Sequence, residues 1–247
     1  MRQRALFLRI RKLFLALSGI VCLAACEVGS TTDRQVQSPP QPPHTYTTNF
    51  PLNEDPISEN KVWINGGDTG LDWTNIQTRN GLAFGTQTGS WAYNDSIAVL
   101  DGSWGPNQSV TATVHTVNQQ GENVIEEVEI LLRFMISPHS ARGYEINFRT
   151  VSSQASYSEV VRWNGPLGDF TYLSKNKGLE FGITNGTTVK ASIIGNVIRV
   201  FINGVQRIQV TDNSVVDGNP GIGFFLANAH GVNGDFGFTS YAASDSQ

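Results

Sequence analysis

Residues 197–210 have the sequence Val197-Ile198-Arg199-Val200-Phe201-Ile202-Asn203-Gly204-Val205-Gln206-Arg207-Ile208-Gln209-Val210. The Asn203-Gly204 pair stands between two runs in which apolar and polar residues alternate. Such a pair is the strongest short-range signal for a hairpin, because both turn positions need a positive φ. Gly195-Asn196 stands in the same way after a third run, residues 189–194. The stretch therefore predicts three consecutive antiparallel strands.

Short alternating runs continue over most of the chain, and no stretch shows the spacing of an amphipathic helix. Turn-forming residues separate the runs, which is typical of two packed antiparallel sheets. We expect one all-β domain over residues 49–247. Further strands are predicted at residues 61–64, 71–77, 82–86, 97–100, 109–117, 126–136, 143–151, 156–163, 170–173, 222–227 and 236–241.

The first 26 residues indicate export and lipid attachment. A basic start precedes the apolar residues 13–25, which have the length of a secretory signal and are too short to span a bilayer. Leu23-Ala24-Ala25-Cys26 places small residues before a thiol that can be acylated. This segment resembles bacterial lipoprotein signals, which implies removal of residues 1–25 and lipidation of Cys26. The alternative is an ordinary signal peptide with an incidental cysteine.

Residues 26–48 are expected to be a proline-rich tether that carries the lipidated cysteine. They contain Ser38-Pro39-Pro40-Gln41-Pro42-Pro43, and proline-rich chains extend by about 3.1 Å per residue. The lipoprotein resemblance implies a place in the bacterial cell envelope. Glu27 replaces the aspartate that is associated with inner-membrane retention, so the outer membrane is favoured over the inner one.

The charge of the chain argues against nucleic acid as a partner. Residues 1–25 hold five of the 17 basic residues and none of the acidic ones, which leaves 12 basic against 21 acidic residues and a net charge of −9. Such a surface would not attract phosphates, so membrane contact should come from the lipid anchor. The four histidines lack metal-ligand spacing, and we expect no cofactor, with structural calcium as the one candidate.

A recurrent order of signals occupies the second half of the domain. A tyrosine-containing strand at residues 143–149 precedes residues 160–165, the three-strand passage and Gly218-Asn219-Pro220-Gly221. This order resembles the jelly-roll domains of the concanavalin A-like lectin/glucanase superfamily, including laminin-G-like modules. The resemblance implies a two-sheet antiparallel jelly-roll sandwich and a polysaccharide or other glycan as partner. The superfamily includes lectins, glycosidases, lyases and adhesive modules, so the activity stays open.

Laminarinase-type glucanases of this superfamily carry Glu-x-Asp-x-x-Glu on one strand. The nearest match is Glu127-Val128-Glu129-Ile130-Leu131-Leu132, in which the second carboxylate is Glu and Leu132 cannot donate a proton. The incomplete motif counts against this activity. If the chain is a hydrolase or lyase, the catalytic candidates are Glu127, Glu129 and Tyr157. A lyase needs a base near an arginine, and these residue types are offered by Tyr144, Tyr157, His139 and Arg142.

Strand alternation predicts a polar patch on one sheet. Glu127, Glu129 and Arg133 alternate with apolar residues that we expect in the core, among them Leu132 and Phe134. The resemblance implies that a glycan lies across such a face. The candidates for glycan contact are Arg133, Glu145, Asn147, Arg149, Arg162 and Trp163. The alternative is that opposite charges on neighbouring strands only solvate the face.

Asp68 and Asp235 follow glycines and could help to bind a structural calcium, or they are ordinary turn residues. The leading hypothesis is a cell-envelope lipoprotein whose jelly-roll domain binds a glycan without cleaving it. The alternatives are a polysaccharide hydrolase or lyase, and a structural or adhesive envelope protein with an exposed apolar patch.

Overall fold

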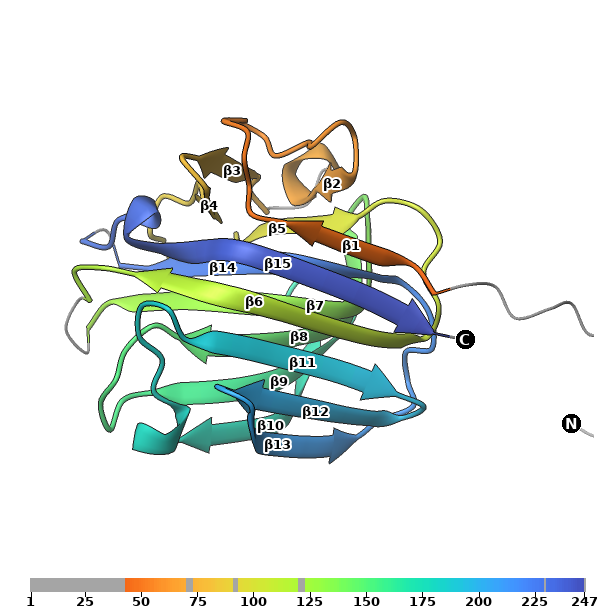
Figure 1. Cartoon of the computed structure of the whole chain (residues 1–247). Helices are drawn as coiled ribbons and strands as arrows, with labels where there is room; N and C mark the ends of the chain where they lie inside the picture. Colours follow the sequence, from red (N-terminus) through yellow and green to blue (C-terminus); the bar gives the residue numbers. More distant parts are fainter. Residues whose placement is uncertain (1–42, 70–72, 91–92, 120–122, 229, 247) are drawn as a thin grey trace, which may run out of the picture. The chain divides into compact units, whose positions relative to one another are not determined.

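The computed structural model describes residues 43–69, 73–90, 93–119, 123–228 and 230–246, which contain two antiparallel sheets (Figure 1). In spatial order, the first sheet contains β13 (Val205–Thr211), β12 (Val197–Ile202), β11 (Thr188–Ile194), β6 (Asn107–Thr116), β15 (Phe236–Ser246), β4 (Leu82–Gly85) and β3 (Ile76–Arg79), and β1 (Thr45–Thr48) pairs with β15. We call it sheet A.

The second sheet, sheet B, runs in the order β10 (Phe170–Lys177), β9 (Tyr157–Pro166), β8 (Ser140–Arg149), β7 (Ile125–Ser137), β14 (Asn219–Ala227), β5 (Ser96–Leu100) and β2 (Trp63–Asn65). Three short 3₁₀ helices complete the described elements, η1 (Gly66–Thr69), η2 (Leu179–Phe181) and η3 (Asn233–Asp235). The expected all-β antiparallel two-sheet sandwich is confirmed.

The three-strand passage has the predicted form. The turn between β12 and β13 places Asn203 at a φ of 48° and Gly204 at 77°, and Gly195 between β11 and β12 has a φ of 59°. Both hairpins close in register, with Ile202 opposite Val205 and Ile194 opposite Val197. The turn residues therefore fix this edge of sheet A.

One hydrophobic core lies between the two sheets. On β6, buried residues alternate with half-buried ones, which puts Val110, Ala112 and Val114 on the inner face. Val128 and Ile130 belong to the same cluster from β7 in sheet B. Because side chains alternate along a strand, Glu127 and Glu129 must then point away from sheet A, onto the outer face of sheet B.

The N-terminal strand β1 lies inside the segment that was expected to be a tether. It pairs with β15 from Thr45 opposite Ser244 to Thr48 opposite Tyr241. His44 extends this contact, since its backbone N–H donates to Asp245 Oδ1 at 2.6 Å and its Nδ1 lies 2.9 Å from Oδ2. The folded part thus begins before Asn49.

A β-bulge interrupts β7 at Arg133. The pairing with β8 shifts between Leu132 and Met135, and Arg133 has a φ of 47°. A Cβ on Gly143 would lie 2.6 Å from the Cα of Phe134, so only glycine allows this close approach. The expected alternation is wrong beyond Leu132, because the bulge turns Phe134 from the core to a second cluster that contains Leu131 and Trp163.

In the described part of the chain, no helix is long and apolar enough to cross a membrane. The predicted signal peptide, Cys26 and most of the predicted tether lie outside the described residues.

Candidate functional site

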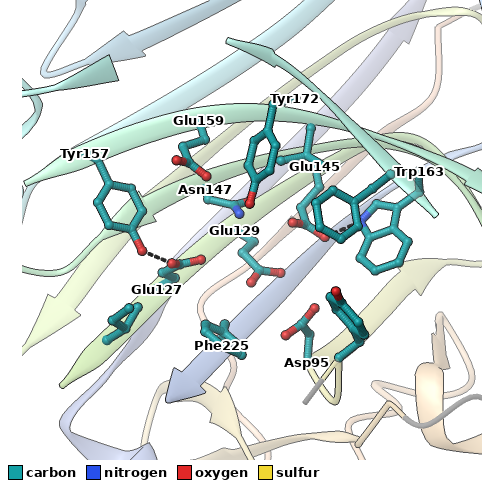
Figure 2. A pocket seen from close by; sticks show the side chains of 14 residues that line it. Asp95, Glu127, Glu129, Glu145, Asn147, Tyr157, Glu159, Trp163, Tyr172 and Phe225 are labelled. Carbon is teal, nitrogen blue, oxygen red and sulfur yellow. Dashed lines mark hydrogen bonds between the residues drawn. The ribbon is translucent and has the colours of Figure 1, made fainter. Parts of the chain in front are cut away.

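A pocket of about 410 Å³ opens on the outer face of sheet B (Figure 2). Five strands of the sheet line it together with the segment that precedes β5. Its lining is rich in carboxylic acids and aromatic rings, and we call it the acidic pocket. The lining residues are Tyr93, Asp95, Ile125, Glu127, Glu129, Glu145, Asn147, Tyr157, Glu159, Val161, Trp163, Phe170, Tyr172 and Phe225.

The strand register brings the polar residues of the pocket side by side. Glu129 on β7 stands opposite Asn147 on β8, and Leu131 stands opposite Glu145. On the other side of β8, Asn147 stands opposite Glu159 of β9. Directly paired residues of antiparallel strands have their Cβ atoms about 5 Å apart. Polar residues at alternate positions of three neighbouring strands therefore form one continuous surface.

The carboxyl groups of the pocket are withdrawn from water although the pocket is open. Glu129 is 1% exposed, Glu145 4%, and Glu127 and Asp95 6% each. Burial raises the pKa of Glu127 to about 8 and that of Glu145 to about 7. Burial, followed by the charge of Glu145, raises the pKa values of Glu129 and Asp95 well above their ordinary range. The site therefore holds protons at neutral pH.

Hydrogen bonds hold the carboxyl groups at the two ends of the pocket. The Tyr157 hydroxyl donates to Glu127 at one end, and Trp163 Nε1 donates to Glu145 Oε2 at 2.7 Å at the other (Figure 2). Between them, Glu129 Oε2 and Asn147 Oδ1 are buried and have no hydrogen-bond partner among the described residues. Both residues line the acidic pocket.

A glycine of the neighbouring strand makes room for the central carboxylate. A Cβ on Gly223 of β14 would lie 2.1 Å from Glu129 Oε2, far inside van der Waals contact. Since Gly223 stands opposite Glu129 in the sheet, the missing side chain leaves the space that the carboxylate occupies.

Aromatic rings form one wall of the acidic pocket. The ring centroids of Trp163 and Phe170 are 5.4 Å apart, those of Phe170 and Tyr172 5.3 Å, and those of Tyr93 and Phe170 5.7 Å. Trp163 is buried, whereas Tyr93 and Tyr172 are 48% and 42% exposed. The wall thus has a fixed base and an accessible rim, and flat exposed rings can pack against the apolar face of a ligand.

The structure brings six of the sequence-derived candidates together in this pocket. They are Glu127, Glu129, Glu145, Asn147, Tyr157 and Trp163. The three candidate arginines do not line it.

Arg133 stabilises the β-bulge of β7 by hydrogen bonds to backbone carbonyls. Its Nε donates to the carbonyl of Pro106 at 2.6 Å, Nη1 to that of Val215 at 2.8 Å and Nη2 to that of Gly195 at 2.7 Å. The residue is 3% exposed. The expectation that Arg133 shares a surface with Glu129 is wrong, because the left-handed backbone at the bulge redirects the side chain.

Arg162 lies on the opposite face of β9 from the pocket. It alternates with Val161 and Trp163, which line the pocket, and its Nη1 lies 2.5 Å from Asp212 Oδ2. The expectation that Arg162 joins the polar patch is wrong for this reason.

Arg149 anchors the chain that follows β8. Nη1 donates to the carbonyl of Ala155 at 3.2 Å and Nη2 to that of Val124 at 3.0 Å. The guanidinium also lies 5.7 Å from the centre of the Tyr157 ring. It therefore supports the wall of the pocket from outside the lining.

Several pocket residues were not among the sequence-derived candidates. Glu159 could have been found, since it alternates with Val161 and Trp163 along β9. Asp95 and Tyr93 precede β5 in a segment without periodic pattern, and only the tertiary structure brings them to the site.

The described residues include no group of three or more His, Cys, Asp or Glu side chains placed to hold a metal ion. Asp235 Oδ2 accepts a hydrogen bond of 3.4 Å from Asn118 Nδ2. The side chain of Asp68 lies outside the description, so the calcium hypothesis stays a prediction.

No family model and no curated protein matches the chain. Solved structures do match. One, from work on the endo-acting O-glycanases that members of the human gut microbiota express to initiate mucin breakdown, has a TM-score of 0.50 at 9% identity, over 81% of this chain and 95% of that chain. A carbohydrate-binding module, CBM66 from Bacillus subtilis, has a TM-score of 0.49 at 12% identity, over 77% and 96%. Porphyranase B from Zobellia galactanivorans has a TM-score of 0.48 at 11% identity, over 86% and 97%.

At these identities the likeness shows the fold alone. The fold is the concanavalin A-like two-sheet antiparallel jelly roll.

Proposed function

We propose that this domain binds a glycan chain in the acidic pocket. The observation that carries the proposal is an aromatic wall beside two buried acceptors, Glu129 Oε2 and Asn147 Oδ1, that have no hydrogen-bond partner within the described part of the chain. A pyranose ring presents hydroxyl donors at its edge and an apolar C–H face. Buried acceptors without a partner cost about 1–3 kcal/mol each, and a sugar hydroxyl would satisfy them.

A single site of this kind is expected to bind weakly. A Kd near 1 mM corresponds to only about −4 kcal/mol. Many copies on one membrane would raise the retention of a long glycan by effective concentration. Lipid attachment through Cys26 is part of this proposal. It is tested by incorporation of radiolabelled fatty acid, which Cys26→Ser is expected to abolish, and labelling of the variant would contradict it.

Co-elution of the purified protein with neutral, amino and acidic polysaccharides in size-exclusion chromatography tests glycan binding. Tyr172→Ala removes an accessible ring, and we expect binding to weaken by about tenfold, since burying an aromatic side chain contributes about 1–2 kcal/mol. Leu179→Ala is the matched control, because Leu179 is 55% exposed and lies outside the pocket. Equal retention of both variants would contradict the proposal.

Hydrolysis of the bound glycan is the second candidate function, and the placement of Glu145 favours it. The sequence motif lacks its third carboxylate, but β8 sets Glu145 opposite Leu131, beside the missing position. A glycosidase needs one protonated carboxyl to protonate the leaving oxygen and one ionised carboxylate to assist attack on the anomeric carbon. Because the pKa of Glu127 is raised to about 8 and that of Glu145 to about 7, Glu127 can supply the proton near neutral pH while Glu145 is partly ionised.

New reducing ends in the co-elution samples would support hydrolysis. We expect Glu145→Gln and Glu127→Gln to abolish them, whereas Glu180→Gln, an exposed carboxylate on η2, should leave them unchanged. A glycan that is retained but not cleaved would support binding without hydrolysis.

Among the lyase candidates, Tyr157 lines the pocket, whereas Tyr144 and Arg142 do not. Tyr144 is fully buried on the inner face and donates to Asp212 Oδ1 at 2.6 Å. Arg142 pairs with Asp217 at an exposed position, away from the residues that line the pocket.

A further inference from the structure

The lining of the acidic pocket is unbalanced in charge. Five carboxyl groups come from the segment before β5 and from three strands, and the described lining residues include no Lys, Arg or His. The five are Asp95, Glu127, Glu129, Glu145 and Glu159.

The nearest cations are engaged outside the lining. The ammonium of Lys175 lies 3.2 Å from the centre of the Tyr172 ring, and its charge partly offsets the rise that burial causes in the pKa of Glu159. Arg149 lies behind Tyr157 and donates to two backbone carbonyls. The centre of the pocket, around Glu129, is therefore left without a balancing positive charge in the part of the chain that the structure describes.

The unmet hydrogen bonds at this centre are all of one kind. Glu129 Oε2 and Asn147 Oδ1 are both acceptors, and neither has a partner among the residues that the structure describes. Glu129 is 1% exposed and Asn147 8%. Once Glu129 has released its proton, a ligand that satisfies both atoms must bring donors, and an ammonium group has three donors and no acceptor.

A bound metal ion does not meet the same need, because the described acidic residues are not grouped for metal coordination. The aromatic wall beside the carboxyl groups instead fits the apolar face of a sugar ring that carries the cation. Aromatic faces also attract a nearby cation directly.

We propose that the glycan recognised by the acidic pocket carries free amino groups, as in a chain of unacetylated hexosamine, and that uronate or sulfated glycans are rejected. This inference rests on the proposed glycan-binding function. The ammonium would lie against Glu129 and Asn147, with the pyranose ring against the wall that Tyr172 completes.

Binding of the cation is then linked to the loss of protons. The titratable groups that face Glu129 are Asp95, Glu127, Glu145 and Glu159, with Tyr157, Tyr172 and Tyr93 on the walls and Lys175 and Arg149 behind them. At pH 5 Glu127 and Glu145, whose pKa values are about 8 and about 7, hold protons that compete with the ammonium. Each unit by which binding lowers a carboxyl pKa raises the affinity by up to about tenfold once the pH exceeds the pKa of the free site.

Titration calorimetry of the full chain in detergent, with a glucosamine tetramer and its N-acetylated counterpart, tests the inference. We expect the free amine to bind at least about tenfold more tightly at pH 7 than the acetylated tetramer, a difference of about 1.4 kcal/mol. The difference should shrink at pH 5, and Glu129→Gln should remove it. Glu180→Gln is the control that should preserve it.

Equal binding of the two tetramers, or tighter binding of a uronate oligomer, would overturn the inference and leave glycan binding intact. Absence of binding to every glycan of the co-elution panel would overturn both. If an oligolysine of the same charge binds as tightly as the glucosamine tetramer, the pocket recognises the cation and not the sugar, which would also overturn the inference.

Discussion

Replacing Glu127 by glutamine is expected to stabilise the folded protein at neutral and alkaline pH. Glu127 is 6% exposed, and its pKa rises from 4.5 to about 8 on folding, mainly through burial. The folded state therefore keeps a proton that the unfolded chain releases above pH 4.5. Stability consequently falls as the pH rises from about 4.5 to about 8, and glutamine removes this loss.

The magnitude follows from the shift. Each pH unit above the unfolded pKa of 4.5 costs the folded state about 1.4 kcal/mol until the folded pKa is reached. At pH 7 the loss of unfolding free energy is therefore about 3 kcal/mol. The hydroxyl of Tyr157 donates to the carboxyl group, and its bond to a neutral amide is weaker by about 1 kcal/mol. A net gain of about 2 kcal/mol is expected at pH 7, and a net loss of about 1 kcal/mol at pH 4, where only the weaker hydrogen bond counts.

Urea unfolding of the wild-type protein and of Glu127→Gln at pH 4, 7 and 8 measures this gain. Glu180→Gln is the control, because its side chain is exposed and outside the pocket. The reasoning is refuted if Glu127→Gln is no more stable than the wild type at pH 8, or if its gain is the same at all three pH values.

Three further predictions concern contacts that stabilise the fold. Arg133→Ala should cost about 3 kcal/mol in unfolding free energy, because it leaves three carbonyls without their donor; thermal unfolding measures the loss, and an unchanged melting temperature would contradict the role of the bulge. Gly223→Ala should cost about 1–3 kcal/mol, since its Cβ would meet the Glu129 carboxylate and Ile97; a double-mutant cycle with Glu129→Ala should recover part of this cost, and additive losses would count against the contact. Hydrogen bonds from Gly105 and His44 outweigh the effect of burial and lower the pKa of Asp245. The contribution of the Asp245 carboxylate to stability is therefore present above pH 4 and is lost as the pH falls. In urea titrations, Asp245→Asn should destabilise the protein by about 1–2 kcal/mol at pH 7 and much less at pH 3.

The sequence predicts the architecture well because local signals carry it. Asn203-Gly204 and the alternating runs on either side define a hairpin by local turn chemistry alone. β1 was missed, since Thr45–Thr48 is short and polar and pairs with the distant β15. Its residues carry no periodic pattern that would reveal this partner.

The candidate site was predictable only where alternation holds. It placed Glu127, Glu129, Glu145 and Asn147 on one surface. It failed at Arg133, because a bulge shifts the period by one residue. Asp95 lies in a segment without regular structure, so no sequence pattern predicts that its side chain lines the pocket. The excess of carboxyl groups over cations therefore became visible only in three dimensions.

Size-exclusion co-elution with the panel of polysaccharides tests the central claim most directly, when wild-type protein, Tyr172→Ala and Leu179→Ala are compared at pH 7. The account predicts that at least one glycan co-elutes with the wild type and with Leu179→Ala, and that Tyr172→Ala loses most of it. If no glycan co-elutes with the wild type, or if Tyr172→Ala retains it as well as Leu179→Ala does, the acidic pocket is not a glycan-binding site.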